Sequence, residues 1–366
     1  MRRSSALLFV GVVALTTLAI TSVSATQYTM IDLGTLGGTA AGAGGINNSG
    51  QVVGDSRLTG DASSHAFLWQ NGSRMRDLGT LGGSDSYAIG INDSGQVVGF
   101  SLLTGNSHYH AFLWQNGSPM GDLGTLGGRD CGAWSINDSG QVVGWSNLTG
   151  SSNVHAFLWQ NGTPTQDLGT LGGGDSFGRG INNSGQAVGH SYLTGDGNYH
   201  AFLWQNGSPM QDLGTLGGTD SGAVGINDSG QVVGWSRLTG DASSHAFLWQ
   251  NGSPMQDLGT LGGSISCAYG INDSGQVVGY SLLTGNSHEH AFLWQNGAPM
   301  HDLGMLGGTD SGALGINDSG LVAGWASDAT GVRHAVVWAP VCEPPSLLAL
   351  LCGLAGIGGM MWRRRR

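Results

Sequence analysis

Short stretches of alternating apolar and polar residues, separated by glycine-rich turns, recur along nearly the whole chain. In the copy between Tyr87 and Leu123 this pattern predicts four short strands, at 87–91, 96–102, 110–115 and 119–123. The segment 92–95, Asn-Asp-Ser-Gly, is typical of a type I turn followed by a glycine in the left-handed conformation. Asn116-Gly117 is a strong signal for a second hairpin. One copy therefore predicts two β-hairpins, joined into a small sheet.

Three signals repeat with a period of 45 residues, and each occurs seven times. Asp-Leu-Gly begins at Asp32, Asp77, Asp122, Asp167, Asp212, Asp257 and Asp302. Ile-Asn-(Asp/Asn)-Ser-Gly begins at Ile46 and His-Ala-Phe-Leu-Trp at His65, and both recur at the same interval. A four-stranded unit of this length predicts an all-β fold, a seven-bladed β-propeller. A β-solenoid is the alternative, but its coils are shorter and do not need two tight hairpins per unit.

The two ends of the repeat region indicate that the blades close into a ring. The segment 28–33 matches the fourth strand of a unit, whereas the last copy ends at Trp338 and has only three strands. We therefore expect the N-terminal strand to complete the last blade, which leaves no open sheet edge at the seam.

Composition narrows the class of partner. The chain contains 68 glycines, only 10% charged residues and a net charge of −11, and all of its cations are arginines. Because an acidic domain repels phosphates and anionic lipid, we expect no nucleic-acid partner. Four cysteines are too few for a disulfide framework, and no bridge is predicted between Cys131 and Cys267.

Both chain ends have the character of targeting segments. Residues 1–25 combine Arg2 and Arg3 with an apolar run and the small-residue site Val23-Ser24-Ala25, which predicts a removable signal peptide. Residues 342–366 contain an apolar stretch, 347–362, followed by four arginines. This stretch is short for a membrane span, and the arginines predict a cytoplasmic end. The domain boundaries are therefore 1–25 for the signal, 26–341 for the propeller and 342–366 for the tail.

The repeated His, Trp and Asp residues have a structural interpretation. The seven tryptophans from Trp69 to Trp338 are expected to fill the space between neighbouring blades. The histidines are expected to bond to backbone or to a repeated aspartate such as Asp77. We therefore predict no catalytic residues among them.

Two positions vary between copies and are often aromatic. Counted from each Asp-Leu-Gly, the residues of the first position are Gly44, Ile89, Trp134, Arg179, Val224, Tyr269 and Leu314. Those of the second are Asp55, Phe100, Trp145, His190, Trp235, Tyr280 and Trp325. Loose packing would explain this variation, and so would a ring-shaped binding surface, because aromatic faces stack on sugars. The ligand-binding candidates are Phe100, Trp145, His190, Trp235, Tyr280, Trp325, Trp134 and Tyr269.

No cofactor and no metal site are predicted, with calcium as the alternative because Asp and Asn in loops can bind it through oxygen. His108 with His110 and His288 with His290 each place two imidazoles on one strand face, without a visible third ligand. An enzyme would need an asymmetric group of acid, base and stabiliser. Arg179, His190 and Glu289 are the least repeated candidates, and we expect them to be dispersed over different units.

The quoted motifs, His-Ala-Phe-Leu-Trp with Ile-Asn-Asp-Ser-Gly and Asp-Leu-Gly-Thr-Leu-Gly-Gly, resemble the extracellular HAF repeats over residues 28–340. This resemblance implies export in bacteria and no established activity.

The tail resembles a PEP-CTERM sorting signal through Glu343-Pro344, the apolar stretch and Arg363, Arg364, Arg365 and Arg366, with Cys342 in place of the first proline. It implies transient membrane anchoring, cleavage by an exosortase-type enzyme, and release to the cell surface or an exopolysaccharide matrix.

These features predict an exported, non-enzymatic binding or structural protein of the cell surface or extracellular matrix, with extracellular polysaccharide as the expected ligand. A protein-interaction scaffold that binds an envelope protein and a polysaccharide-active enzyme are the alternatives. Weak sites repeated around one ring would gain from avidity.

Overall fold

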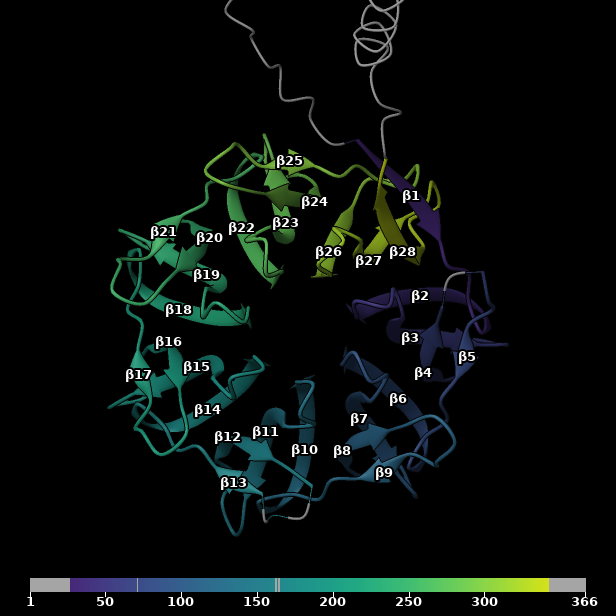
Figure 1. The fold of residues 1–366 in the computed structure, drawn as a ribbon, viewed down its shortest axis with the longest axis horizontal. Coiled ribbons are helices and arrows are strands. Elements are labelled where there is room, and N and C mark those ends of the chain that lie inside the picture. The colour runs from purple at the N-terminus through teal and green to yellow at the C-terminus, as the bar shows by residue number, and fades with distance from the viewer. Residues whose placement is uncertain (1–26, 71, 162, 164, 342–366) are drawn as a thin grey trace, which may run out of the picture.

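The computed structural model describes residues 27–341, except residues 71, 162 and 164. The described residues form 28 β-strands and contain no helix, so none that could cross a membrane. Seven twisted sheets stand around one axis like the blades of a propeller (Figure 1). The all-β seven-bladed β-propeller predicted from the repeat is confirmed.

Each blade has four antiparallel strands, and the blades are numbered 1 to 7 from β2 onward. The inner strands, which surround the axis, are β2 (Gly37–Ile46), β6 (Gly82–Ile91), β10 (Gly127–Ile136), β14 (Gly172–Ile181), β18 (Gly217–Ile226), β22 (Gly262–Ile271) and β26 (Ser311–Ile316). The second strands are β3 (Val52–Leu58), β7 (Val97–Leu103), β11 (Val142–Leu148), β15 (Ala187–Leu193), β19 (Val232–Leu238), β23 (Val277–Leu283) and β27 (Val322–Ser327).

The third strands are β4 (Ser64–Trp69), β8 (Tyr109–Trp114), β12 (Val154–Trp159), β16 (Tyr199–Trp204), β20 (Ser244–Trp249), β24 (Glu289–Trp294) and β28 (Arg333–Pro340). The outer strands of blades 1 to 6 have only two residues each and are β5 (Arg76–Asp77), β9 (Gly121–Asp122), β13 (Gln166–Asp167), β17 (Gln211–Asp212), β21 (Gln256–Asp257) and β25 (His301–Asp302). One parallel bridge, between Ser244 and Ile265, links blades 5 and 6.

The N-terminal strand closes the ring, as predicted. Strand β1 (Tyr28–Asp32) pairs with β28, with Met30 opposite Trp338, and supplies the outer strand of blade 7 (Figure 1). The repeated His–Asp pair is completed across the same seam, because Nδ1 of His334 lies 2.9 Å from a carboxylate oxygen of Asp32. The two ends of the propeller are therefore joined by the interaction that recurs inside every other blade.

The repeated histidines and aspartates have the structural role expected of them. Nδ1 of His65 lies 2.9 Å from the carboxylate of Asp77, and each of the other copies repeats this contact. The same carboxylate accepts a hydrogen bond from the backbone N–H of Gly79, two residues on. Each pair thus fixes the short outer strand to the third strand and shapes the turn that follows.

Hydrophobic packing occurs between blades. Trp69 and Phe67 of blade 1 form one cluster with Val337 of blade 7, and equivalent clusters fill the other interfaces. The six repeated phenylalanines are almost completely buried. Burial of a side chain of this size stabilises the fold by about 2–3 kcal/mol. The predicted role of the tryptophans between blades is confirmed.

The hairpin turns are where the sequence predicts them, but two strand boundaries differ. Gly95 has a φ of 75° and its N–H bonds to the carbonyl of Asn92. β6 begins at Gly82, five residues before the predicted start, because the preceding segment pairs with the end of β7. The fourth strand is shorter than predicted. The predicted signal peptide and sorting tail lie outside the described residues, as do Cys342 and the sorting residues.

Candidate binding cavity

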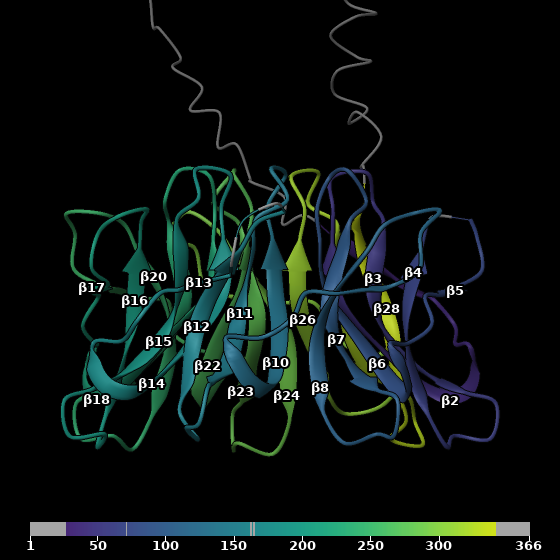
Figure 2. The ribbon, with the colours of Figure 1, turned by 90° about the horizontal axis from the view of Figure 1, so that it is seen from below.

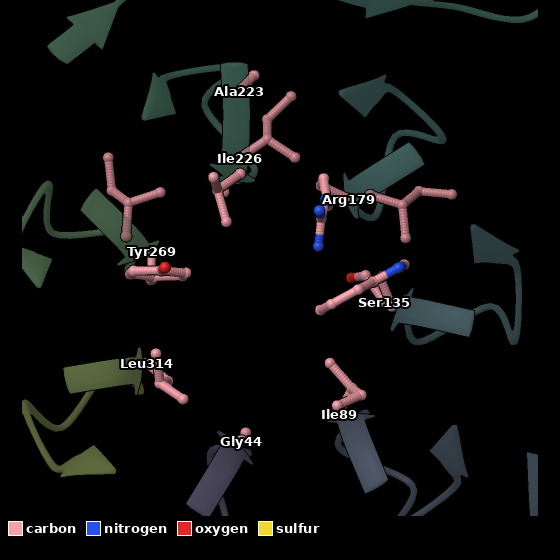
Figure 3. Close-up of a pocket in the computed structure, with 18 of the residues that line it drawn as sticks. Gly44, Ile89, Ser135, Arg179, Ala223, Ile226, Tyr269 and Leu314 are labelled. Carbon is pink, nitrogen blue, oxygen red and sulfur yellow. The ribbon is translucent and has the colours of Figure 1, made fainter. Parts of the chain in front are cut away.

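A cavity of about 560 Å³ lies on the ring axis, between the inner strands (Figure 3). Residues of the first variable position line it in all seven blades, and six of them contribute a side chain. They are Gly44, Ile89, Trp134, Arg179, Val224, Tyr269 and Leu314. This position was one of the two expected to form a binding surface.

A β-bulge in each inner strand places these side chains. In blade 3, Ala133 pairs with Gly144 and Ser135 pairs with Val143, so Trp134 has no partner on the neighbouring strand. The same register shift occurs in the other six blades. A bulge re-aims the unpaired residue, and here it turns all seven toward the axis, six of them with a side chain.

The cavity wall contains one charged side chain. Arg179 is the only Arg, Lys, Asp or Glu among the residues that line the cavity. Its Cζ lies 3.9 Å from the ring centroid of Trp134 in the neighbouring blade, which is a close cation–π contact. Tyr269 lies across the cavity from Arg179 in Figure 3. Burial raises the pKa of Tyr269, so its phenol is neutral.

A second group of aromatic side chains continues the wall between blades 4 and 5. The His190 ring stacks on Phe177 at 4.9 Å between centroids, and Tyr199 follows at 5.4 Å. Tyr199 in turn contacts Trp235 at 5.9 Å. Burial, together with the charge of Arg179, lowers the pKa of His190 to about 3. The imidazole is therefore neutral near pH 7.

Only two of the candidates at the second variable position line the cavity. His190 and Trp235 line the cavity, whereas Phe100, Trp145, Tyr280 and Trp325 do not. All six side chains are half-buried, so the tryptophans do not form an exposed rim. Their role as ligand-binding residues remains a prediction.

Packing against the inner strand explains much of the variation at this second position. Tryptophan occurs in blades 3, 5 and 7, where the residue opposite is Gly132, Gly222 or Gly312. A Cβ at Gly132 would lie 2.8 Å from Nε1 of Trp145, so the indole needs glycine beneath it. In blade 2 the opposite residue is Tyr87, and Phe100 stacks on it at 5.1 Å. A tryptophan at the second variable position is therefore accommodated by the glycine opposite it, whereas Phe100 packs on an aromatic ring.

Layers of identical residues surround one end of the cavity. The seven isoleucines from Ile46 to Ile316 line both this cavity and a smaller one of about 180 Å³. Beyond them, each asparagine of the repeat donates from Nδ2 to the backbone carbonyl of the next, at 3.0–3.1 Å. The following residues form a second ring, which contains the carboxylates of Asp93, Asp138, Asp228, Asp273 and Asp318.

The histidine pairs considered as metal ligands contact separate carboxylates. Nδ1 of His108 lies 3.4 Å from Asp130, whereas Nδ1 of His110 lies 2.8 Å from Asp122. His288 likewise lies 3.6 Å from Asp310. Within the part of the chain that the structure describes, no group of three or more His, Cys, Asp or Glu side chains could hold a metal ion. Cys131 and Cys267 are buried free thiols, as expected.

One expectation about the less repeated residues is wrong. Arg179 and His190 belong to the same blade, on β14 and β15, and both line the cavity. Glu289 lies on β24 and does not line it. Among the ligand-binding candidates, the sequence interpretation included Trp134 and Tyr269 but left out Arg179. A charged residue at a position where six copies are uncharged was the signal that could have identified it.

Comparison with known proteins adds little beyond the fold. No protein-family model matches the chain, and a search of curated proteins found no match. Among solved structures, TolB from Acinetobacter baumannii is similar, with 12% identity, a TM-score of 0.48 and coverage of 81% of this chain. The chain spans about 64% of the length of that TolB structure.

Two further structures share less. XC5397 from Xanthomonas campestris, a gluconolactonase, has 9% identity and a TM-score of 0.37, with 75% of this chain and 90% of that protein covered. BT0996, in a complex with RGII, has 9% identity and a TM-score of 0.28, with 56% of this chain and 84% of that protein covered. At such values the similarities carry no inference about function.

Proposed function

We propose that this chain is an exported, non-enzymatic binding protein of the bacterial cell surface or extracellular matrix, that it recognises polysaccharide, and that the axial cavity is its binding site. The observation that carries the proposal is the placement of Trp134 and Tyr269 in the wall of a cavity of about 560 Å³. Small-molecule pockets have volumes of roughly 300–1,000 Å³, and aromatic faces stack on the apolar faces of sugar rings.

The titratable groups of the cavity support binding over catalysis. A general acid or base works best with a pKa near the ambient pH. Here burial lowers the pKa of His190 to about 3 and raises that of the Cys267 thiol to about 12. No Asp or Glu of the described residues lines the cavity. These groups would hold their protonation states throughout the physiological range.

The proposal for localisation rests on the sequence of the two chain ends. A signal peptide over 1–25 and a PEP-CTERM-like tail over 342–366 would route the protein through the membrane, with transient anchoring before an exosortase-type enzyme releases it. An envelope protein as partner, in place of a polysaccharide, is an outcome that the following experiment can reveal.

Affinity electrophoresis in gels containing neutral and acidic bacterial polysaccharides tests the proposal directly. We expect the wild-type protein to be retarded by at least one polymer, and Trp134→Ala and Tyr269→Ala to lose most of this retardation. Trp325→Ala is the matched control, because Trp325 belongs to the other variable position and does not line the cavity. Loss of binding in Trp325→Ala alone would move the site elsewhere. Absence of retardation by every polymer, with the fold confirmed by circular dichroism, would contradict polysaccharide binding.

A further inference from the structure

Arg179 carries a charge that the protein itself leaves uncompensated. Within the described residues, its guanidinium forms no ion pair and no hydrogen bond. It makes a cation–π contact with Trp134. Arg237 and Arg76 differ in this respect. Arg237 lies 3.2 Å from Asp220, and Arg76 donates to the Asn116 amide oxygen at 2.8 Å.

Leaving such a group unpaired in a cavity is costly. Burial lowers the pKa of Arg179, yet a guanidinium stays protonated in proteins. Its five N–H donors find no acceptor among the described residues, and Nε1 of the adjacent Trp134 is a buried donor without a partner. No acidic side chain of the cavity wall can supply those acceptors.

We infer that Arg179 binds the carboxylate of an acidic sugar, so that the ligand of the cavity is a hexuronic acid at or near a polysaccharide end; this rests on the function proposed above. A planar guanidinium matches a carboxylate through two parallel N–H···O bonds. The contact with Trp134, in which Cζ lies 3.9 Å from the ring centroid, holds the guanidinium in the cavity wall. One cation also matches one negative charge, which favours a carboxylate over a dianionic phosphate.

The uncharged remainder of the cavity wall can contact the uncharged part of a sugar ring. His190 is neutral, so Arg179 is the single charged group toward which the ligand can orient. Tyr269 and Leu314 supply an aromatic and an apolar surface on the opposite side (Figure 3). The orientation of the acid group and the stacking of the ring are thus provided by different blades.

Charge also determines the direction of entry. Five carboxylates surround the smaller cavity beyond the isoleucine layer, and they repel an anion. We therefore expect the ligand to enter from the opposite mouth, so that a chain end is bound and no chain threads through the ring. The acidic net charge of −11 opposes the ligand at long range, so the attraction must come from Arg179 within the cavity.

Isothermal titration calorimetry with short oligosaccharides tests the inference. The probes are oligomers of galacturonic and glucuronic acid, their carboxyl-reduced neutral counterparts, and sulfated and phosphorylated hexoses. For Arg179→Gln we expect about a ten- to hundredfold loss of affinity for the uronic acid oligomers, the loss typical of a charge-assisted hydrogen bond. Arg333→Gln is the matched control, because Arg333 stacks on Trp325 at 4.0 Å but does not line the cavity.

The outcomes separate the inference from the proposed function. Equal affinity for acidic and carboxyl-reduced oligomers, or an Arg179→Gln protein that binds like the wild type, would overturn the role of Arg179 while polysaccharide binding stood. Preference for a sulfate or phosphate ester would overturn the carboxylate assignment. If the folded wild-type protein bound neither the acidic nor the neutral oligomers, the proposed function itself would fall. Thermal unfolding of each variant shows that the comparison is made between folded proteins.

Discussion

The side-chain amide of Asn317 donates a hydrogen bond to the backbone carbonyl of Asn47, 3.0 Å away and 270 residues earlier in the chain. It closes a ring of seven identical bonds, and each of the other six links residues that are 45 positions apart. The ring joins the inner strands of all blades at one end of the axis (Figure 2 shows the blades from the side). A repeated sequence can satisfy such a ring only when the number of blades closes the circle.

The adjacent ring of acidic residues predicts opposite effects for two conservative substitutions. Nδ2 of Asn48 donates to the carboxylates of both Asp93 and Asp318. Asn48→Asp would remove both donors and join the carboxylates on either side into an unbroken run of six around the ring, which we expect to lower the free energy of unfolding by roughly 1–2 kcal/mol. Asp273→Asn would instead supply a donor between Asp228 and Asp318, and we expect it to stabilise the protein. Urea denaturation at low ionic strength compares the two. Equal effects of the two changes would show that repulsion in this ring is negligible.

Loss of the His–Asp contact should destabilise the protein more at the seam between β1 and β28 than at the equivalent position in blade 3. Asp32→Ala and Asp167→Ala remove the same interactions, namely a contact with histidine and a bond from a glycine N–H. Among the described residues no strand precedes β1, whereas β13 is connected to strands of the propeller on both sides. We therefore expect Asp32→Ala to lower the unfolding temperature more and to increase hydrogen exchange over residues 28–32. Equal losses in both variants would indicate that closure at β1 does not limit stability.

The period of 45 residues predicted the blades, their number and the seam, because each Asp-Leu-Gly and Asn-Asp-Ser-Gly signal reflects local turn chemistry. It did not predict which side chains surround the axis. The direction in which the Trp134 and Arg179 side chains point depends on a β-bulge. The alternation of apolar and polar residues does not reveal a one-residue shift in strand pairing. The pairing of Trp145 with Gly132 likewise depends on the strand register, which the sequence pattern does not specify.

The first blade carries an ionisable group where three others carry tryptophan, and this predicts a pH effect. Burial raises the pKa of Asp55 from 3.8 to about 6, although Arg57 opposes the shift. Between these values the folded state binds more protons than the unfolded state, so stability falls as the pH rises. Asp55→Asn should therefore stabilise the protein by about 2 kcal/mol at pH 7.5 and have little effect near pH 4. Urea denaturation at both pH values measures this difference. A constant difference across this range would contradict burial of the carboxyl group.

The uncompensated charge of Arg179 predicts that the unliganded protein becomes more stable when it is removed. Arg179→Met keeps a long side chain that can pack on Trp134 but has no charge to desolvate. Loss of the cation–π contact costs about 1 kcal/mol, whereas an unpaired charge in a partly buried site costs more. We expect a net gain of about 1 kcal/mol in the free energy of unfolding, measured by denaturant titration without ligand.

Arg333→Met is the control for this stability change, because its guanidinium also stacks on a tryptophan. Because Arg333 lies outside the cavity, we expect Arg333→Met to lose the cation–π contact without any compensating gain in the free energy of unfolding. A destabilised Arg179→Met protein would mean that the charge is already satisfied without ligand, for example by ordered water, and the case for Arg179 as an anion-binding residue would lose its energetic basis. Stabilisation of Arg179→Met together with loss of uronic acid binding would instead show that this position is kept for the ligand at a cost to the fold.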